Sequence, residues 1–212
     1  MFPMMPPPDN AKILFNGRDV ENWTTREGQP AEWKVANGDL HATPGKGDIM
    51  TKERFTDFYL HIEFNCPDMP EATGQAKGNS GVFLQGRYEV QVLDSFGWEK
   101  PGKGDTGGVY DQFAALVNAC KPALHWQTYD IAFRAPRFEN GEMVSNTRLT
   151  VFQNGKIVQN NIELPGVTGA PLDLKVEEPG PLLVQDHGDL VRFRNIWVVE
   201  LPLVGSDEYA PA

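Results

Sequence analysis

The stretch that decides the fold is Gly78-Asn-Ser-Gly-Val-Phe-Leu-Gln-Gly-Arg-Tyr-Glu-Val-Gln-Val-Leu-Asp-Ser95. Its apolar runs and central glycine predict two strands, 82–84 and 88–93, joined by a tight turn at 85–87. Such a hairpin buries one face and leaves the other for solvent or for a ligand. It therefore predicts an antiparallel sheet with one face available for binding.

The second strand of this hairpin alternates between apolar and polar side chains. Glu89 and Gln91 are expected to lie about 7 Å apart on one face of the strand. Asp94 follows at the strand end and joins this face only if a bulge near Leu93 shifts the register. A carboxylate and an amide in one row favour a sugar-binding face over a plain solvent face. The apolar residues that face the other way are Tyr88, Val90 and Val92.

The composition is that of a folded globular protein. The chain has 212 residues, of which 40% are hydrophobic and 23% are charged, as in an ordinary globular domain. The formal net charge of −10 disfavours nucleic acid and anionic lipid as partners. A neutral, hydroxyl-rich ligand is compatible with this charge, whereas the oligomeric state is not predicted by it.

Short strands separated by turn residues continue along most of the chain. Asn37-Gly38 and Asn154-Gly155 each stand between alternating segments, which is the strongest short-range signal for a hairpin. Only residues 110–119 have a helical pattern, and that pattern is short. Roughly ten short strands with hardly any helix predict an all-β sandwich or barrel. The other predicted strands are 13–15, 33–41 (as a hairpin), 49–51, 55–64, 126–135, 147–152, 156–162 and 191–201, the last with a shift of phase midway.

Three regions are predicted along the chain: a Pro-rich lead at 1–10, a single domain at 11–202 and a tail at 203–212. The N-terminus lacks the basic and apolar regions of a signal peptide. No apolar run reaches the roughly 18 residues of a transmembrane helix. Cys66 and Cys120 favour two free buried thiols, although they could pair if the fold brought them together.

Other polar clusters could also carry chemistry. The Gly-rich loop at 95–108 is predicted to be functional, because long loops inside compact domains usually are. His125-Trp126 and the Gln185-Asp-His187 run place a titratable ring beside an aromatic or an amide, groups that contact sugars. The alternation of polar and apolar residues around His61 predicts that it is a surface histidine rather than a ligand. The aspartates whose oxygens could suit a calcium ion are Asp94, Asp105, Asp186 and Asp189.

Several motifs occur together in one known pattern. They are Phe15-Asn-Gly-Arg-Asp19, Asn37-Gly-Asp-Leu40, Asn79-Ser-Gly-Val-Phe83, Tyr88-Glu-Val-Gln-Val-Leu-Asp94, Gly108-Val-Tyr110 and Val184-Gln-Asp-His-Gly188. Over residues 12–201 the chain resembles the 3-keto-disaccharide hydrolase domain family. The resemblance implies a concanavalin-A-like jelly roll of two curved antiparallel sheets, and it suggests a periplasmic or secreted location.

Laminarinase-type glycoside hydrolases of the same fold carry Glu-x-Asp-x-x-Glu on the catalytic strand. The corresponding run here is 89–94, in which Gln91 replaces the middle carboxylate and Asp94 replaces the longer final one. A retaining mechanism requires two carboxyl groups about 5 Å apart, so these departures argue against it. The family resemblance implies instead the cleavage of glycosides whose C3 hydroxyl is already oxidised to a ketone, by elimination followed by hydration.

That reaction needs a general base, an acid for the leaving oxygen and donors for the enolate. Glu89 or His187 is predicted to be the base, and Asp94 the other proton carrier. No cofactor is certain, and calcium is the only candidate. The residues predicted to bind substrate are Gln91, Gln185 and Arg194 at the ketone and hydroxyls, Asn79 as a residue that shapes the site, and Tyr110 and Trp126 as its walls.

Two alternatives from other classes remain open, because a fold alone does not decide function. A non-catalytic, lectin-like carbohydrate-binding module needs the aromatic and amide side chains but tolerates the loss of the carboxylates and of His187. A structural domain would be expected to form oligomers through its sheet edges.

Overall fold

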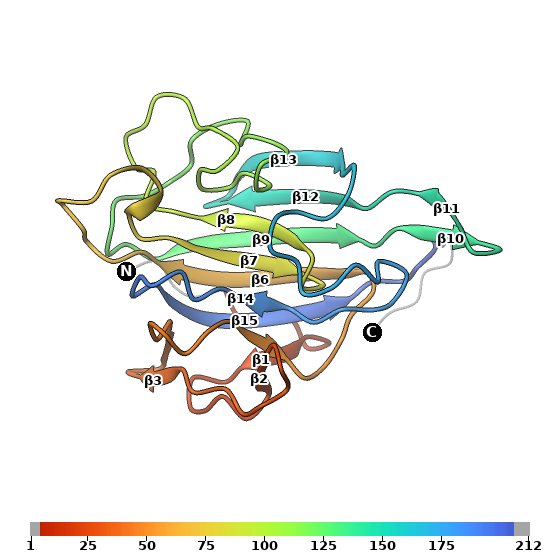
Figure 1. Ribbon diagram of the computed structural model, residues 1–212, viewed down its shortest axis with the longest axis horizontal. Helices are drawn as coiled ribbons and strands as arrows, with labels where there is room; N and C mark the ends of the chain where they lie inside the picture. The colour runs from red at the N-terminus through yellow and green to blue at the C-terminus, as the bar shows by residue number, and fades with distance from the viewer. Residues whose placement is uncertain (1–4, 206–212) are drawn as a thin grey trace.

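The computed structural model describes residues 5–205, which form two packed antiparallel sheets (Figure 1). The ends of the predicted lead and tail, 1–4 and 206–212, lie outside the described residues. The larger sheet has eight strands, in the order β13 (Lys156–Glu163), β12 (Arg148–Gln153), β9 (Gln127–Arg134), β6 (Phe58–Asn65), β15 (Arg192–Glu200), β4 (Asp39–His41) and β3 (Lys34–Ala36), with β1 (Lys12–Phe15) also paired to β15. The smaller sheet has five, in the order β2 (Trp23–Thr25), β5 (Ile49–Thr51), β14 (Leu183–Val184), β7 (Ser80–Leu84) and β8 (Tyr88–Val92). A separate hairpin joins β10 (Arg137–Glu139) and β11 (Glu142–Ser145).

The core lies between the two sheets, and the predicted faces of the central hairpin are confirmed. The Tyr88 ring on β8 contacts the Phe133 ring on β9 across the sandwich, with ring centroids 5.6 Å apart. Val90 and Val92 are fully buried beside it. Each such side chain contributes about 1.5–3 kcal/mol when it leaves water, so the apolar half of the β8 alternation fixes which face points inward. The all-β sandwich predicted from the sequence is therefore confirmed.

The tight turns occur where the glycines predict them. Asn37 and Asn154 have positive φ angles of 56° and 53°, and each precedes a glycine that also has a positive φ. This backbone matches the twist of two-residue hairpin turns. The two predicted Asn-Gly hairpins are confirmed as β3–β4 and β12–β13, and the central turn contains Gly86 with a φ of 66°.

The helix predicted at 110–119 is wrong. The segment forms turns, and the Phe113 N–H donates to the Val109 carbonyl oxygen (3.0 Å) while the Val109 N–H donates to Phe113 (2.9 Å). The Val109 N–H bond to Phe113, together with the Tyr110 N–H bond to the Glu89 carbonyl oxygen on β8 (3.1 Å), replaces the weak helical preference of a short segment. Within 5–205 the single helical element is the 3-10 turn Gly74–Ala76, and no helix there could cross a membrane.

The alternation of its strand predicted His61 to lie on the surface. This prediction is wrong, because the residue has 0% exposure. Its ring stacks on Trp197 at a centroid distance of 5.0 Å, and its Nδ1 lies 2.7 Å from Asp130 Oδ1. Trp197 reaches this face because Asn195, with a φ of 47°, interrupts the register of β15. The predicted shift of phase in this strand is confirmed, and it supplies the side chain that covers His61.

Both cysteines are free thiols. Cys66 is buried and Cys120 is half-buried. Burial raises the pKa of the Cys66 thiol well above its ordinary value and that of Cys120 to about 11. Because the thiolate is the reactive form, neither group is poised for nucleophilic chemistry at neutral pH.

Candidate functional site

The face of the smaller sheet that points away from the core carries a row of polar side chains. Gln91 on β8 lies opposite Gly81 on β7. Gln185, directly after β14, donates its backbone N–H to the Gly81 carbonyl oxygen (3.0 Å). Glu89 lies two residues before Gln91 and therefore on the same face of β8. Antiparallel pairing thus places the side chains of Glu89, Gln91 and Gln185 in one row, although they come from distant parts of the sequence.

Loop segments at 75–79, 104–110 and 168–170 surround this row. The Tyr110 N–H donates to the Glu89 carbonyl oxygen (3.1 Å), and the Glu89 N–H donates to Thr168 Oγ1 (2.9 Å). The loops and the row enclose a cavity of about 190 Å³, which we call the polar pocket. It is lined by Gln75, Asn79, Glu89, Gln91, Tyr110, Gly169, Ala170, Gln185 and His187.

Glu89 is the carboxyl group of the polar pocket, and it is only 4% exposed. Its side chain occupies the space above Gly81, where a Cβ atom would lie 2.5 Å from Glu89 Oε1. Phe83 is its directly paired neighbour on β7 and belongs to a small apolar cluster. Burial, reinforced by the negative charge of Asp48, raises the pKa of Glu89 to about 8. The carboxyl group is therefore mainly protonated at neutral pH.

Three buried amide oxygens of the polar pocket have no hydrogen-bond partner among the described residues: Asn79 Oδ1, Gln91 Oε1 and Gln185 Oε1. The amide nitrogen of Asn79 donates to the Gln75 carbonyl oxygen (2.8 Å), and that of Gln91 donates to the Gly104 carbonyl oxygen (3.2 Å). Because these nitrogens are bound to carbonyl groups, the oxygens are the free ends. Buried acceptors without partners are costly, so this arrangement favours a ligand that brings hydroxyl or N–H donors.

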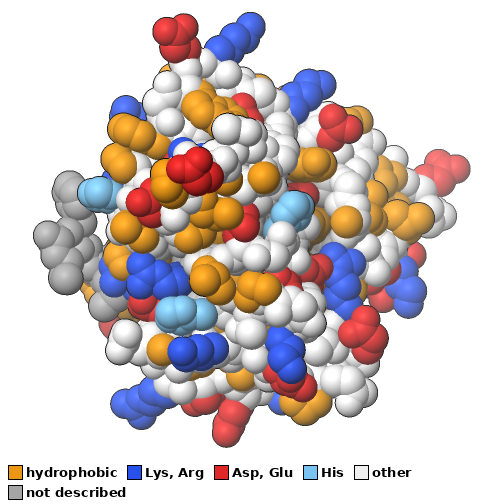
Figure 2. Space-filling view, turned by 60° about the vertical axis from the view of Figure 1, so that its left-hand side comes forward, with side chains coloured by type: hydrophobic (Ala, Val, Ile, Leu, Met, Phe, Trp, Pro, Cys, Tyr) orange, Lys and Arg blue, Asp and Glu red, His pale blue; other side chains and the backbone are white. Residues whose placement is uncertain are grey.

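His187 lies at the exposed rim of the polar pocket. It follows Asp186, whose carboxylate accepts the N–H groups of Gly47 and Gly188, both at 3.0 Å. The turn therefore fixes the backbone at His187 and leaves the imidazole free to meet a ligand. In the part of the chain that the structure describes, no Lys or Arg lines the pocket. Figure 2 shows acidic and basic side chains mixed over the face that it draws.

Six of the nine sequence-predicted site residues line the polar pocket, namely Asn79, Glu89, Gln91, Tyr110, Gln185 and His187. Asp94 does not. Strand β8 ends at Val92, and the Asp94 carboxylate, 2% exposed, lies 3.2 Å from Lys77 Nζ. This ion pair and the Asp94 N–H bond to the Lys77 carbonyl oxygen (3.1 Å) attach the end of β8 to the preceding loop.

Trp126 and Arg194 also lie apart from the polar pocket. Arg194 is on β15 of the larger sheet, and Trp126 directly precedes β9 of the same sheet. The Arg194 guanidinium lies 4.0 Å from the centroid of the Trp126 ring and donates to Glu63 Oε2 (2.8 Å). The two residues form a cation–π pair with each other.

Three lining residues were not predicted from the sequence: Gln75, Gly169 and Ala170. Gln75 lies in the polar loop before the central hairpin, and it reaches the pocket through its bond to Gly104 (2.7 Å). Ala170 is placed by the bond from Arg26 to its carbonyl oxygen (3.0 Å). No local pattern signals these contacts, because each depends on a loop that returns from another part of the chain.

The aspartates predicted as calcium ligands are dispersed among other contacts. Asp189 accepts the Asn79 N–H (2.7 Å), Asp105 accepts the Gly102 N–H, and Asp186 closes the turn described above. Among residues 5–205, no three His, Cys, Asp or Glu side chains are grouped so as to hold a metal ion. Calcium thus stays a prediction for which these residues supply no ligand cluster.

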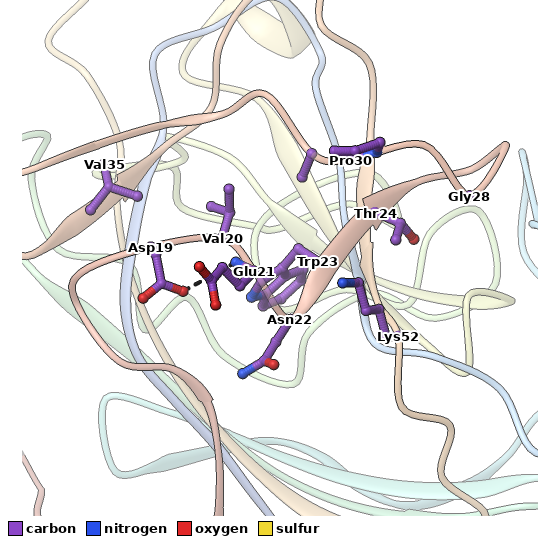
Figure 3. Close-up of a pocket in the computed structure, with 11 residues that line it drawn as sticks. Asp19, Val20, Glu21, Asn22, Trp23, Thr24, Gly28, Pro30, Val35 and Lys52 are labelled. Carbon is purple, nitrogen blue, oxygen red and sulfur yellow. Dashed lines mark hydrogen bonds between the residues drawn. The ribbon is translucent and has the colours of Figure 1, made fainter.

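A larger groove of about 760 Å³ lies at the edge of the smaller sheet, beside β2 (Figure 3). Its Trp23 side chain is buried and donates to the Leu14 carbonyl oxygen (2.9 Å). In Figure 3 the Glu21 N–H donates to Asp19 (3.1 Å). None of the described residues that line this groove has an unpartnered buried side-chain nitrogen or oxygen atom. The polar pocket is therefore the better candidate site, although it is smaller.

A family model described as a 3-keto-α-glucoside-1,2-lyase-like domain matches residues 10–199. The chain belongs to this family. The predicted 3-keto-disaccharide hydrolase family is thereby confirmed, and the match contains every residue of the polar pocket. Comparison with curated proteins gives no significant match.

Among solved structures, the family fold recurs in proposed glycosyl hydrolases of Parabacteroides distasonis. One is 41% identical, with a TM-score of 0.84, over 92% of this chain and 85% of that chain. A second is 19% identical, with a TM-score of 0.68, over 91% and 94% of the two chains. The second likeness concerns the fold alone. Together with the family match, the first indicates a carbohydrate-active protein.

Proposed function

We propose that this protein cleaves 3-keto-glycosides by elimination and hydration in the polar pocket. The observation that carries the proposal is the neutral Glu89 carboxyl group, buried in a cavity with three unpartnered amide oxygens and with His187 at the rim. A protonated carboxyl group can donate to a leaving oxygen, and an imidazole can accept a proton. The family membership supports the 3-keto-sugar as the substrate class.

In the first step, His187 removes the proton from C2 of the sugar, which the neighbouring C3 ketone makes acidic. The C2–H electron pair forms the C1=C2 double bond, and the bond from C1 to the glycosidic oxygen breaks. Glu89 gives its proton to that oxygen, so the alcohol leaves neutral. The step yields an unsaturated 3-keto-sugar, a protonated His187 and an ionised Glu89.

In the second step, water adds to the double bond. The ionised Glu89 takes a proton from the water as its oxygen bonds to C1, and the protonated His187 returns a proton to C2. The product is the free 3-keto-sugar, and both side chains regain their starting protonation states. No oxidant or reductant is consumed, because the ketone is present in the substrate and in the product.

The donors and acceptors of the polar pocket also favour one orientation of the sugar. Amide oxygens accept hydrogen bonds from hydroxyl groups but repel the oxygen of a ketone. Hydroxyl groups of the sugar therefore face Asn79, Gln91 and Gln185. The ketone oxygen faces the side on which Tyr110 can donate through its phenol, and that bond strengthens as the enolate forms.

A double-displacement mechanism is less compatible with these residues. It requires a second carboxyl group to attack C1. Within residues 5–205, Glu89 is the only Asp or Glu that lines the polar pocket. Asp94 is paired with Lys77, and Asp48 accepts two bonds, from Arg26 (2.7 Å) and from the Asp186 N–H (2.9 Å). Neither is free to act as a nucleophile.

The test is release of the aglycone from a 3-keto-glucoside and from its unoxidised parent, each with and without a chelator. We expect release from the keto-sugar alone. Glu89→Gln and His187→Ala are each expected to lower kcat by at least about a hundredfold, the usual contribution of a general acid or base. Unchanged release by both variants would refute the assignment of roles, and a loss of release with chelator would establish a metal requirement.

The second candidate is a carbohydrate-binding module without catalysis, and the three unpartnered amide oxygens favour it independently of Glu89. Such a module would bind the keto-sugar or its parent without releasing the aglycone. Its affinity would also survive Glu89→Gln, because the amide side chain fills the same space. Calorimetry on the wild-type protein beside the release assay separates the two functions.

A further inference from the structure

We infer that Gln75 is a positioning residue that sets which end of two pocket amides faces the sugar. Gln75 lies on the exposed 3-10 turn outside the sheets. It extends its side chain between the loop at Gly104 and the amides of Asn79 and Gln91. The inference rests on the proposed function, since it concerns binding of the sugar in the same pocket.

The argument begins at the Gly104 carbonyl oxygen, which can only accept hydrogen bonds. Gln75 Nε2 donates to it at 2.7 Å, so Gln75 must present its oxygen on the other side. That oxygen accepts from Asn79 Nδ2 (3.3 Å) and from Gln91 Nε2 (3.2 Å). The Gly104 carbonyl oxygen thus fixes the polarity of the Gln75 amide, which together with two backbone carbonyl oxygens orients the amides of Asn79 and Gln91.

These bonds use all the N–H groups of the two pocket amides. An amide nitrogen carries two hydrogens. Asn79 uses one on the Gln75 carbonyl oxygen (2.8 Å) and one on Gln75 Oε1. Gln91 uses one on Gly104 (3.2 Å) and one on Gln75 Oε1. Because both nitrogens are saturated, the unpartnered Asn79 Oδ1 and Gln91 Oε1 are the groups left for the ligand.

Only a glutamine fits this position. The residue must accept two hydrogen bonds and donate one, at the end of a chain long enough to reach from the exposed turn. A glutamate accepts but has no N–H for Gly104, and a lysine donates but cannot accept. A Cβ atom on Gly104 would lie 3.2 Å from Gln75 Nε2, so the glycine at 104 also leaves space for the side-chain amide of Gln75.

Loss of the Gln75 side chain leaves one N–H of each pocket amide without its partner, so each group is held only by its remaining bond to a backbone carbonyl oxygen and is less firmly oriented. We expect Gln75→Ala to raise KM for a 3-keto-glucoside by about tenfold, which corresponds to one to two hydrogen bonds, while kcat falls much less. The thermal midpoint should stay within a few degrees, because Gln75 is exposed. Gln75→Glu keeps an acceptor for both amides but has no N–H for the Gly104 carbonyl oxygen, so it is expected to stay impaired like Gln75→Ala.

The experiment combines these kinetics with the exchange of the side-chain amide protons of Asn79 and Gln91, measured by NMR on the full chain. In the wild type these protons should exchange slowly, and in Gln75→Ala they should exchange at least about tenfold faster. Gln29→Ala replaces an exposed glutamine outside the pocket and is the matched control for both measurements. Unchanged KM and unchanged exchange in Gln75→Ala would overturn the inference.

The two readouts keep this inference distinct from the proposed function. Amide exchange requires no substrate, so it tests the role of Gln75 even if the wild type releases no aglycone. A wild type that cleaves the keto-sugar with the same KM as Gln75→Ala supports the proposed function and refutes the positioning role. A rise in kcat and KM together would also refute it, because orientation of the binding amides predicts a change mainly in KM.

Discussion

Replacing Glu89 with glutamine is expected to change how the stability of the protein depends on pH. The wild-type carboxyl group has a pKa of about 8 in the folded protein, against the ordinary 4.5. Between these values the unfolded chain is ionised at this position while the folded protein keeps its proton. The folded state then binds one more proton, so the free energy of unfolding falls as pH rises through this window.

The magnitude follows from the width of the window. From 4.5 to about 8 is about 3.5 pH units, and each unit lowers the free energy of unfolding by about 1.4 kcal/mol. The Glu89 contribution is therefore complete below pH 4.5 and has fallen by up to about 5 kcal/mol at pH 8. Glutamine has similar size and no charge, so the variant lacks this slope.

The assay is urea denaturation of the wild type and of Glu89→Gln at half-unit steps from pH 5 to pH 9. The difference in free energy of unfolding should move in favour of the variant as pH rises and should level off near pH 8. Glu142→Gln, at an exposed position on β11, is the matched control and should run parallel to the wild type. Parallel curves for Glu89→Gln, within about 1 kcal/mol, would refute the raised pKa.

Three further substitutions test the architecture of the site. Gly81→Ala introduces a Cβ 2.5 Å from Glu89 Oε1 and 2.9 Å from the Phe83 ring, so kcat/KM should fall at least about tenfold because the Glu89 carboxyl group is displaced. Gly166→Ala is the control, because its Cβ would meet open space, and it should retain activity. Equal rates for the two variants would contradict this prediction. Arg87→Met removes a buried guanidinium that binds Asp173 and the Glu178 carbonyl oxygen (2.7 and 2.8 Å). The free energy of unfolding, measured by denaturation, should fall by about 3 kcal/mol, and hydrogen exchange at 168–178 should become faster. Unchanged exchange there would show that Arg87 does not hold this segment. Trp126→Ala should cost about 1 kcal/mol through its cation–π contact and leave kcat/KM within about twofold, and a large loss of activity would place Trp126 in substrate binding.

Local patterns predicted those parts of the fold that local chemistry determines. The alternation around Val90 assigned the two faces of β8 correctly, because a period of two separates core from surface in any half-buried strand. The Asn-Gly turns were predicted for a similar reason, since few residues tolerate the positive φ they require. The helix predicted at 110–119 is wrong because this segment bonds to β8 through Tyr110 and to β13 through Leu116, and such tertiary bonds leave no periodic signal in the sequence.

The candidate site likewise contains residues placed by local patterns and residues placed by tertiary contacts. Asn79, Glu89 and Gln91 were predicted to lie together because they belong to one hairpin, and its register brings them to one cavity. Trp126 does not line the polar pocket, and its place could not be predicted because an aromatic residue beside a strand could face either side of either sheet. Gln75 was missed because its role depends on a bond to Gly104, in another loop.

The electrostatics of the polar pocket bear on the alternative that the sequence left open, in which either Glu89 or His187 could be the base. A carboxyl group held neutral by burial and by Asp48 cannot accept the C2 proton before it has lost its own. It can give a proton to the departing oxygen, and the resulting carboxylate can then activate water. The order of these two events matches an elimination followed by a hydration, so the same burial that weakens Glu89 as a first base suits it for the second step.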